Sequence, residues 1–295
     1  MVAYPVRSTA TNFTIPESVT HIGGGAFEAN LGLLQITFSA NLTSIGPKAF
    51  AYTRMTTVTL PDSLVTLEAE AFLSSTSLES IVLGPNLTTI GAEAFHSCSS
   101  LQSVSLPESV TTLGTGAFAN CRNLTHFDLP DSIEIIPELA FSNCTSLQSF
   151  EFSPELRTIG ESAFRDCRNL PQITLPDEIT SIGDWAFTDC QSLTTVNFGA
   201  GFTIFSPRSF LNCPRLNTFT IAPENPNFSI VDHAFYSKEM TILFMVPAGY
   251  HQPTFEVPSS VTELGERAFS NCLGLTKIHL PENLETIGDF AFDQC

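Results

Sequence analysis

The chain has 295 residues, of which 30 are acidic and 12 are basic, so its formal net charge at pH 7 is −18. No run of Lys or Arg is long enough to follow a phosphate backbone, and this charge balance excludes nucleic acid and anionic membrane surfaces as expected partners. Because no stretch approaches about 18 consecutive apolar residues, we also expect no direct insertion into a membrane.

Residues 1–12 are expected to form a lead-in to the first repeat. This segment has no basic stretch followed by an apolar core, so it shows no secretory signal. Two interpretations stay open. Either the protein is intracellular, or the sequence is part of a longer secreted chain.

From residue 13 to residue 221 we expect nine repeats of one phrase. An Ala-Phe pair, often followed by a cysteine three residues after the Phe, returns about every 23 residues. Such a period is typical of a solenoid, in which each coil contacts only its neighbours. Twelve phenylalanines anchor the phrase along the whole chain: Phe27, Phe50, Phe72, Phe95, Phe118, Phe141, Phe164, Phe187, Phe210, Phe235, Phe269 and Phe292.

Each repeat combines two hydrophobic patterns, which the repeat 106–129 illustrates. The alternation at residues 127–129 predicts a short strand of the kind that stacks in a parallel sheet. Pro107 follows the preceding strand and ends its hydrogen-bond ladder, because proline has no N–H. The apolar pair Val110 and Leu113 then predicts a second short extended segment on the opposite side of the coil.

The phenylalanine-bearing part of the coil has a different spacing. Apolar residues recur every third position from Phe118 through Cys121 to Leu124, which predicts one tight helical or 3₁₀ turn. A glycine usually precedes this turn, but Pro137 stands in that column, so the corner need not be left-handed. The predicted fold is a repeat solenoid of the α/β type, mostly β. It has about twelve coils, with a parallel sheet on one face and short extended or 3₁₀ segments on the other.

The recurrent phenylalanines and cysteines are assigned a structural role. Those of the regular repeats are Phe95, Phe118, Phe141, Phe164, Phe187, Phe210, Cys98, Cys121, Cys144, Cys167, Cys190 and Cys213. Buried free thiols are the favoured interpretation of this column, with disulfides and metal binding as alternatives. No Cys-x-x-Cys pair exists, and no histidine lies beside the column at zinc-ligand spacing, so we expect no metal and no cofactor.

Residues 222–257 form an irregular long repeat that places eleven extra residues between Phe235 and Phe269. We expect Phe235-Tyr236 to pair with residues 241–245 as a hairpin around residues 237–240. This hairpin would add apolar and aromatic surface near Tyr250 and His251, which makes the unit the first place to look for a partner.

Residues 258–295 are expected to resume the regular repeats, the last of them truncated. Cys295 falls in the middle of a repeat, before the strand that would follow Phe292. This favours the interpretation that the chain is a piece of something longer.

A histidine and a carboxylate lie on one exposed strand face at His126 and Asp128, because alternate residues of a strand point the same way. With Ser149 they suggest a hydrolytic site, but nothing in the sequence makes a nucleophile elbow or an oxyanion turn. We therefore interpret the scattered histidines as surface residues. The remaining outward strand positions form a hydroxyl-rich strip without large aromatic anchors.

The repeated phrase L-P-x-S-V-T-x-I-G-x-x-A-F-x-x-C-x-x-L-x-x-I-x-L resembles the BspA-like class of leucine-rich repeat. The resemblance covers nearly the whole chain from about Phe13, and it includes a long divergent unit with residues 225–228, 236–238 and 246–249. One departure is Asp232-His233-Ala234, where the family usually has Asp-Gly, so a tight turn is not assured there. The resemblance implies a curved, right-handed leucine-rich-repeat solenoid. It also implies, in many members, a secreted or cell-surface protein that attaches to host matrix proteins or to other cells.

We therefore expect a non-enzymatic protein-binding or adhesion module whose extended surface engages a protein or another cell-surface macromolecule. The open ends of the repeat array would also allow self-association. The alternatives are a cytoplasmic interaction scaffold and, from a different class, a hydrolase that uses His126, Asp128 and Ser149. The candidate binding residues are Phe235, Tyr236, Phe244, Tyr250, His251, His126 and Asp128.

Overall fold

The computed structural model describes residues 11–295, so all but the last two residues of the expected lead-in 1–12 lie outside the described part. Over this range the chain contains short strands joined by turns and no α-helix. It divides into two compact units, Met1–Glu155 (unit 1) and Leu156–Cys295 (unit 2). The prediction of a mostly β repeat solenoid with parallel sheets is confirmed.

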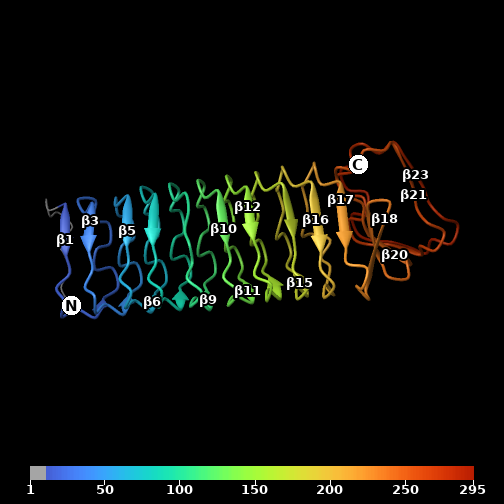
Figure 1. The fold of residues 1–295 in the computed structure, drawn as a ribbon. Helices are drawn as coiled ribbons and strands as arrows, with labels where there is room; N and C mark the ends of the chain where they lie inside the picture. The colour runs from blue at the N-terminus through green and yellow to red at the C-terminus, as the bar shows by residue number, and fades with distance from the viewer. Residues whose placement is uncertain (1–10) are drawn as a thin grey trace. The chain divides into compact units, whose positions relative to one another are not determined.

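Most coils of unit 1 contribute two kinds of strand, which run in two rows (Figure 1). In the coil that contains Ser103, an isolated bridge to Ser80 takes the place of the first-row strand. Strands of the first row are three residues long: β1 (Asn12–Thr14), β3 (Gln35–Thr37), β5 (Thr57–Thr59), β7 (Ser80–Val82), β10 (His126–Asp128) and β12 (Ser149–Glu151). Strands of the second row are two residues long: β2 (His21–Ile22), β4 (Ser44–Ile45), β6 (Thr66–Leu67), β8 (Thr89–Ile90), β9 (Thr112–Leu113) and β11 (Ile135–Ile136). Pairing is parallel and in register with the repeat, as where Asn12 faces Gln35, so equivalent side chains stack from coil to coil.

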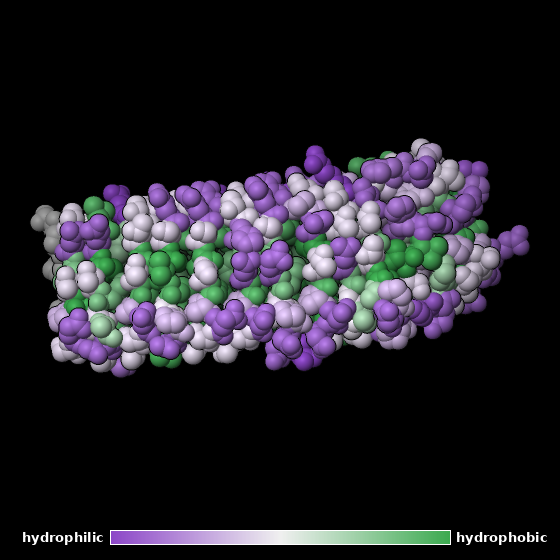
Figure 2. All heavy atoms as spheres, viewed as in Figure 1, coloured by the Kyte–Doolittle hydropathy of each residue, from purple (hydrophilic) through white to green (hydrophobic). Residues whose placement is uncertain are grey.

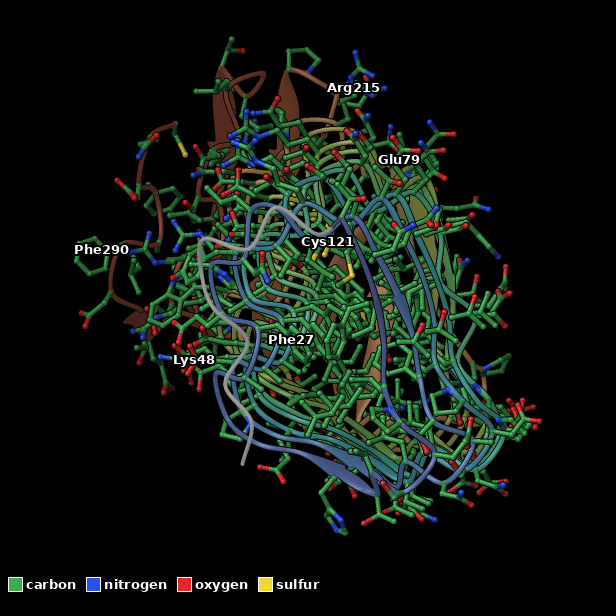
Figure 3. All side chains as sticks on the ribbon, turned by 90° about the vertical axis from the view of Figure 1, so that its left-hand side faces the viewer. Phe27, Lys48, Glu79, Cys121, Arg215 and Phe290 are labelled. Atoms are coloured by element: carbon green, nitrogen blue, oxygen red, sulfur yellow. The ribbon has the colours of Figure 1, made fainter. Side chains whose placement is uncertain are left out.

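The core of unit 1 is a column of phenylalanine rings. Neighbouring rings from Phe27 to Phe141 lie nearly parallel, with centroids 5.1 to 5.6 Å apart. Viewed along the coils, Phe27 and Cys121 point inward, whereas Lys48 and Glu79 point outward (Figure 3). The repeated Ala-Phe phrase therefore builds the core, as its apolar character predicts.

The segment that carries the phenylalanine is a chain of β-turns and not the expected helical or 3₁₀ turn. In the coil of Phe118, Gly116 (φ 62°) and Asn120 (φ 61°) are left-handed, which a helix does not allow. The amides of Ala117, Ala119 and Cys121 bond within the coil to the third residue before them. Amides between them donate to the following coil, as where Phe118 N donates to Ala140 O at 2.9 Å. Bonding to the neighbouring coil thus replaces a helical ladder.

Gly114, at the start of this segment, allows close approach to the preceding coil. A Cβ atom on Gly114 would lie 2.2 Å from Ala92 N and 2.5 Å from Ala92 Cα. Gly114 does not have a positive φ, since Gly25 and Gly116 are the left-handed glycines of the described residues. The expectation that this corner need not be left-handed is therefore confirmed.

Unit 2 begins with regular coils and then changes pattern. The regular strands are β13 (Thr158–Ile159), β14 (Gln172–Thr174), β15 (Ser181–Ile182), β16 (Thr195–Phe198), β17 (Thr218–Ile221), β21 (Thr254–Glu256), β22 (Glu263–Leu264), β23 (Lys277–His279) and β24 (Thr286–Ile287). The irregular strands are β18 (Phe228–Val231), β19 (Ala234–Ser237) and β20 (Ile242–Met245). Strand β19 lies between β18 and β20 and is antiparallel to both, and β20 then pairs in parallel with β22.

The expected hairpin of Phe235-Tyr236 with residues 241–245 is confirmed, because β19 pairs antiparallel with β20. A second tight turn joins β18 to β19 at Asp232 (φ 46°) and His233 (φ 68°). The sequence leaves this turn open because its second residue is not glycine. The structure shows that both residues adopt the left-handed conformation of a type I′ turn.

Phe235 does not belong to the phenylalanine column, which corrects the series of twelve anchors. Its ring lies in β19 and stacks on Phe205 at 4.4 Å. The place before Phe269 is taken by Val246, whose amide donates to Ala268 O at 2.7 Å as the column phenylalanines do in other coils. The interval from Val246 to Phe269 is the regular 23 residues. The extra residues therefore precede Val246 and form the β18–β19 hairpin.

Asn225 attaches the irregular unit to the coil before it. Its side chain is fully buried, and its Nδ2 donates to the carbonyl oxygens of Ala200 (3.0 Å) and Phe202 (2.8 Å). Its Oδ1 accepts from the amides of Asn227 and Phe228, each at 2.9 Å. Every polar atom of the buried amide is therefore used, which holds the start of β18 in place.

Candidate functional site

A hollow of about 500 Å³ opens in unit 2 where the irregular coil meets the regular coils on either side of it. Its polar and aromatic lining consists of Asp189, Gln191, Asn212, Tyr250, His251 and Asn271. These residues come from successive coils, those of Phe187, Phe210, Val246 and Phe269. The hollow therefore depends on the stacking of the coils and not on one local motif.

Three of the lining residues occupy one repeated place, the second residue after the column phenylalanine. Asp189 (φ 63°), Asn212 (φ 55°) and Asn271 (φ 63°) are all left-handed, a conformation that Asp and Asn adopt more readily than most residues. In the irregular coil Ala248, two residues after Val246, occupies the same place. Because Ala248 has a small side chain, the row of corner side chains is interrupted and the hollow forms.

Gly249 allows the irregular coil to pack closely against the preceding coil. Its amide donates to Leu216 O at 2.8 Å, and a Cβ atom there would lie 2.7 Å from the same oxygen. A turn follows, in which Tyr250 N donates to Pro247 O at 2.9 Å. The glycine is thus required for close approach, and it sets where the Tyr250 side chain begins.

Tyr250 is half-buried at the wall of the hollow. Its ring packs edge-on against Phe255 with centroids 5.3 Å apart, and its hydroxyl lies 3.5 Å from Thr254 O. Partial burial, with a smaller effect from the negative charge of Asp232, raises the pKa of Tyr250. The phenol therefore stays protonated at neutral pH and keeps its hydrogen-bond donor.

His251 is exposed and borders two hollows. Its Nε2 lies 3.3 Å from Asn217 Nδ2, and a smaller hollow of about 210 Å³ lies on that side, lined also by His233 and Gln252. Tyr250 and His251 line both hollows. This dipeptide therefore separates two adjoining recesses of unit 2.

The larger hollow carries little charge. Its lining includes one carboxylate, Asp189, and no Lys or Arg. Asn212 Nδ2 donates to Asp189 Oδ1 at 3.2 Å, which aligns the two side chains. Leu273 stands at the rim with 75 % of its surface exposed. The hollow thus combines side-chain amides, one carboxylate, an aromatic ring and an exposed apolar side chain.

The predicted binding residues of the irregular unit lie in different environments in the structure. Phe235 and Tyr236 are 0 % and 1 % exposed, so they form core and do not add the expected aromatic surface. Phe244 is half-buried and packs against Phe228 at 5.8 Å. Tyr250 and His251 line the hollow. Phe235 is buried against the rings of Phe205 and Phe228, and Tyr236 lies on the other face of β19 in the apolar cluster that contains Leu243 and Phe255.

Sequence reasoning missed Asp189, Asn212 and Asn271 as site residues. They precede column cysteines, where an Asp or Asn recurs in most repeats, so they look like ordinary turn residues. The available signal was the 23-residue interval between Val246 and Phe269, which marks the coil that has Ala248 in the same place.

His126, Asp128 and Ser149 do lie in contact in unit 1. His126 Nδ1 is 2.6 Å from Ser149 Oγ, and His126 Nε2 is 2.8 Å from Asp128 Oδ1. The imidazole uses its two nitrogens in the opposite sense to a Ser-His-Asp triad, where Nε2 faces the serine. The His126 and Asp128 side chains are 48 % and 67 % exposed, so water screens the ion pair. We interpret this group as a polar cluster on the strand face.

Unit 1 offers hollows of a different character. On the face shown in Figure 2, hydrophobic residues form a band along unit 1 between polar rows. A hollow of about 330 Å³ lies beside β3 and β5 and is lined by Ile36, Phe38 and Leu60 among others. Another of about 540 Å³ lies beside β9 and β11, and its lining has no aromatic side chain. Neither combines amides with an aromatic ring as the hollow of unit 2 does.

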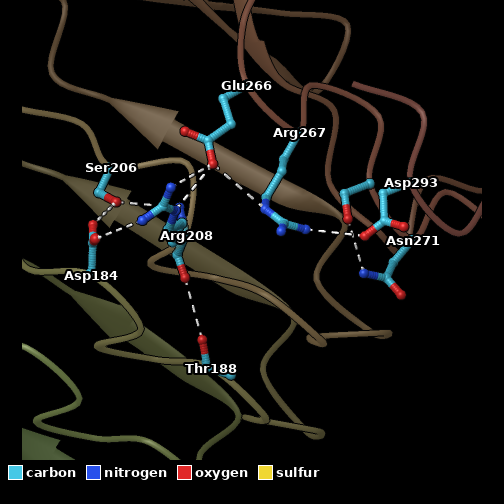
Figure 4. Close-up of polar contacts among 9 residues, drawn as sticks. Asp184, Thr188, Ser206, Arg208, Glu266, Arg267, Asn271 and Asp293 are labelled. Carbon is cyan, nitrogen blue, oxygen red and sulfur yellow. Dashed lines mark hydrogen bonds and ion pairs between the residues drawn. The ribbon is translucent and has the colours of Figure 1, made fainter. Parts of the chain in front are cut away.

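A network of ion pairs in unit 2 connects coils on either side of the irregular unit (Figure 4). The Arg208 guanidinium lies 2.9 Å from Glu266 Oε1 and 3.4 Å from Asp184 Oδ2. The Arg267 guanidinium lies 3.0 Å from Asp293 Oδ2. Arg208 precedes the irregular unit and Glu266 follows it, so their contact closes the regular coils around the inserted hairpin.

The cysteine column consists of free thiols, and all but Cys295 are buried. The thiols also have a polar role, because those of Cys98, Cys121, Cys144, Cys190, Cys213, Cys272 and Cys295 donate to a carbonyl of the preceding coil. Cys121 Sγ, for example, donates to Phe95 O at 3.2 Å. In an earlier repeat Ser75 Oγ makes the equivalent bond to Phe50 O at 2.9 Å. This position therefore suits a small buried side chain that donates a hydrogen bond, and both cysteine and serine provide one.

Thiol reactivity is expected to separate Cys295 from the other cysteines. Burial raises the pKa of Cys98, Cys144, Cys213 and Cys272 to about 12, so at pH 8 almost none of these thiols is in the reactive thiolate form. A maleimide should therefore modify about one thiol per native chain, and all eight in denaturant. Mass spectrometry checks the number, and Cys295→Ser should abolish native labelling. Rapid native labelling of several thiols would contradict the buried column.

Within residues 11–295 no helix is long and apolar enough to cross a membrane. In the same part of the chain no three His, Cys, Asp or Glu side chains are grouped closely enough to hold a metal ion.

The family described as "BspA type Leucine rich repeat region (6 copies)" matches residues 6–125, 114–241 and 250–295. A search of curated protein sequences finds no relative.

Solved structures of bacterial repeat proteins are similar to this chain. A leucine-rich repeat protein from Bacteroides ovatus is 23 % identical with a TM-score of 0.64, covering 96 % of this chain and 70 % of its own. A leucine-rich cell surface protein from Faecalibacterium prausnitzii is 24 % identical with a TM-score of 0.58, covering 97 % and 67 %. The leucine-rich repeat protein of T. pallidum is 27 % identical with a TM-score of 0.51, covering 56 % and 79 %.

Proposed function

Because the chain belongs to the BspA-type leucine-rich repeat family, we propose that it is a non-enzymatic binding module that holds a macromolecular partner at or near a cell surface. The repeated coils serve as the scaffold. Recognition takes place at the irregular unit, residues 222–257, which we propose as a functional segment of its own. The flanking repeats 13–221 and 258–295 position it.

The hollow beside Tyr250 and His251 is the observation that carries this proposal. The outward strand positions of the regular coils are rich in small hydroxyl side chains and have no large aromatic anchors, which are common among residues that dominate binding energy. The irregular coil interrupts the row of Asp and Asn side chains and places a tyrosine, a histidine and the exposed Leu273 around a recess. Tyrosine beside apolar neighbours is typical of residues that dominate binding energy at interfaces.

The proposed location at a cell surface rests on likeness. The relative from Faecalibacterium prausnitzii is described as a cell surface protein. It shares the fold over 97 % of this chain. The strong negative charge suits a partner whose contact surface is neutral or basic.

The test is recovery of a partner from matrix and cell-surface extracts on the immobilised chain, compared between single-residue variants. We expect Tyr250→Ala to reduce recovery of the partner at least tenfold. The matched control is Tyr52→Ala, which removes an exposed tyrosine of unit 1. Point variants are preferred to deletion of residues 225–250, because that deletion removes β18, β19, β20 and the Asn225 anchor. Equal loss in both variants, or no loss in either, would contradict the proposed site.

A further inference from the structure

We infer that the hollow lined by Asp189, Asn212, Tyr250 and Asn271 is a saccharide subsite that takes a neutral sugar unit of the partner's glycan. This inference rests on the proposed function and specifies the chemistry of the same site. The volume of about 500 Å³ lies within the range of about 300–1,000 Å³ for small-molecule sites.

The polar groups of the hollow match the hydroxyls of a sugar. Each hydroxyl both donates and accepts hydrogen bonds, and a side-chain amide offers two donors and an acceptor. Gln191, Asn212 and Asn271 bring three amides to the recess, and Asp189 adds a carboxylate acceptor. The Asn212 to Asp189 bond of 3.2 Å holds a donor and an acceptor side by side. Adjacent hydroxyls of a sugar ring fit such a pair.

The apolar groups match the other side of a sugar ring. A pyranose carries C–H groups on its faces, and these pack against aromatic rings and aliphatic side chains. Tyr250 supplies the ring, which Phe255 holds from behind at 5.3 Å. Leu273 at the rim supplies exposed aliphatic surface. The hydroxyl of Tyr250 donates to Thr254 O at 3.5 Å, and its oxygen remains able to accept a hydrogen bond from a sugar hydroxyl.

The charge of the site selects neutral sugars. No Lys or Arg lines the hollow, whereas a phosphate, a sulfate or a sugar carboxylate needs such a partner. Asp189 and the net charge of −18 repel anionic ligands as well. The geometry therefore points away from sialylated and sulfated glycans.

A peptide strand is a poorer match for the same recess. Extended peptides bind by pairing with free backbone groups at a sheet edge. Here the amides of Gly249 and Tyr250 already donate to Leu216 O and Pro247 O. Side chains and not backbone groups are therefore available to the ligand.

The experiment is isothermal titration of the full chain with lactose, cellobiose, diacetylchitobiose and mannobiose, with sialyllactose as the charged comparison. At least one neutral disaccharide should bind with a Kd of about 1 mM or lower, and sialyllactose at least tenfold more weakly. Failure of all four neutral sugars to bind, or stronger binding of sialyllactose, would overturn the inference.

Variants locate the binding in the hollow. Asn212→Gly removes the amide and keeps a residue that tolerates the left-handed backbone, and it should weaken sugar binding at least tenfold. Asn120→Gly is the matched control, because Asn120 (φ 61°) occupies the same repeat place in unit 1, and it should leave the Kd unchanged. Tyr250→Phe should bind measurably and Tyr250→Ala should not. Unchanged binding in Asn212→Gly and Tyr250→Ala would place the sugar elsewhere and refute the subsite.

The outcome also separates this inference from the proposed function. If the immobilised chain recovers a partner equally well after the partner's glycans have been removed enzymatically, the saccharide subsite is wrong and the proposed binding function stands. If a neutral sugar binds at the hollow but no macromolecule is recovered, the subsite stands and the proposed function fails.

Discussion

Replacing Phe118 by alanine is expected to lower the free energy of unfolding by about 3 to 5 kcal/mol. The ring is fully buried between Phe95 and Phe141, with centroid distances of 5.2 and 5.6 Å. It also contacts Phe127 edge-on at 5.2 Å. Its loss removes apolar burial and leaves a cavity that the adjoining coils cannot close, because the amide of residue 118 still ties the backbone to Ala140 O.

Equilibrium unfolding in urea, followed by circular dichroism, measures this effect. The matched control is Val82→Ala, which shortens an exposed side chain on strand β7 and should change stability by less than about 0.5 kcal/mol. Because each coil contacts only its neighbours, a loss in the middle of the column weakens the coils on both sides. Coincident urea midpoints for Phe118→Ala and the parent chain would show that the ring column is not a main source of stability.

Gly114→Ala is expected to destabilise the protein by about 3 kcal/mol, near the upper end for overpacked sites. The added methyl group would lie 2.2 Å from Ala92 N and 2.4 Å from Gly91 C. Both are backbone atoms of the preceding coil, so no side chain is able to move aside. The two coils must separate, and the hydrogen bond from Gly114 N to Ile90 O at 2.8 Å is then strained.

Gly116→Ala provides a comparison within the same coil. Gly116 has a φ of 62°, so alanine there meets left-handed strain of about 1–2 kcal/mol, but its Cβ would lie no closer than 3.4 Å to a neighbour. Glu93 and Leu139 occupy the same place in adjacent coils at φ 55° and 59°, which shows that the fold accommodates side chains there. Urea unfolding should therefore rank Gly114→Ala below Gly116→Ala. The reverse ranking would mean that backbone conformation, and not the spacing of coils, explains the glycines.

Much of the fold was predictable because the same pattern of apolar residues recurs in nearly every coil. Apolar residues that return every 23 positions must face one core, so the roles of Phe118 and Cys121 follow from spacing alone. The proline at Pro137 correctly indicated that the corner is not left-handed. Confirmation of these points shows that side-chain periodicity determines which residues are buried.

The course of the backbone within the turn segment was not predictable in the same way. Glu93 and Leu139 have no preference for a left-handed conformation, yet both adopt it. They do so because alternate amides donate to the neighbouring coil, and this requires the peptide planes to turn. The cause lies in the adjacent coil and leaves no signal in the residue type.

The candidate site was predicted only in part for a similar reason. A break in the period pointed to Tyr250 and His251, and both line the hollow. Phe235 was misplaced because an aromatic residue after alanine looks like another anchor, whereas Val246 takes that place. Asn212 and Asn271 line a hollow only because the coil of Ala248 lies between their coils. The parallel pairing of β20 with β22 stacks that irregular coil on the next regular one.

In the coil of Phe118 the turn segment and the second row of strands carry backbone hydrogen bonds of opposite direction. In the coil of Phe118 the amides of Gly116, Phe118 and Asn120 all donate forward to the next coil, at 2.9, 2.9 and 2.7 Å. Their peptide dipoles are therefore parallel and add from coil to coil, as they do along a helix and as they do not across an antiparallel sheet. The positive end of this column lies toward the coils of higher residue number. In the same coil the amides of Thr111, Thr112 and Gly114 donate backward, to Thr88 O and Ile90 O. The dipoles beside the second row of strands therefore oppose those of the turn segment, so the two edges of this coil differ in polarity while their dipoles largely cancel along the stack.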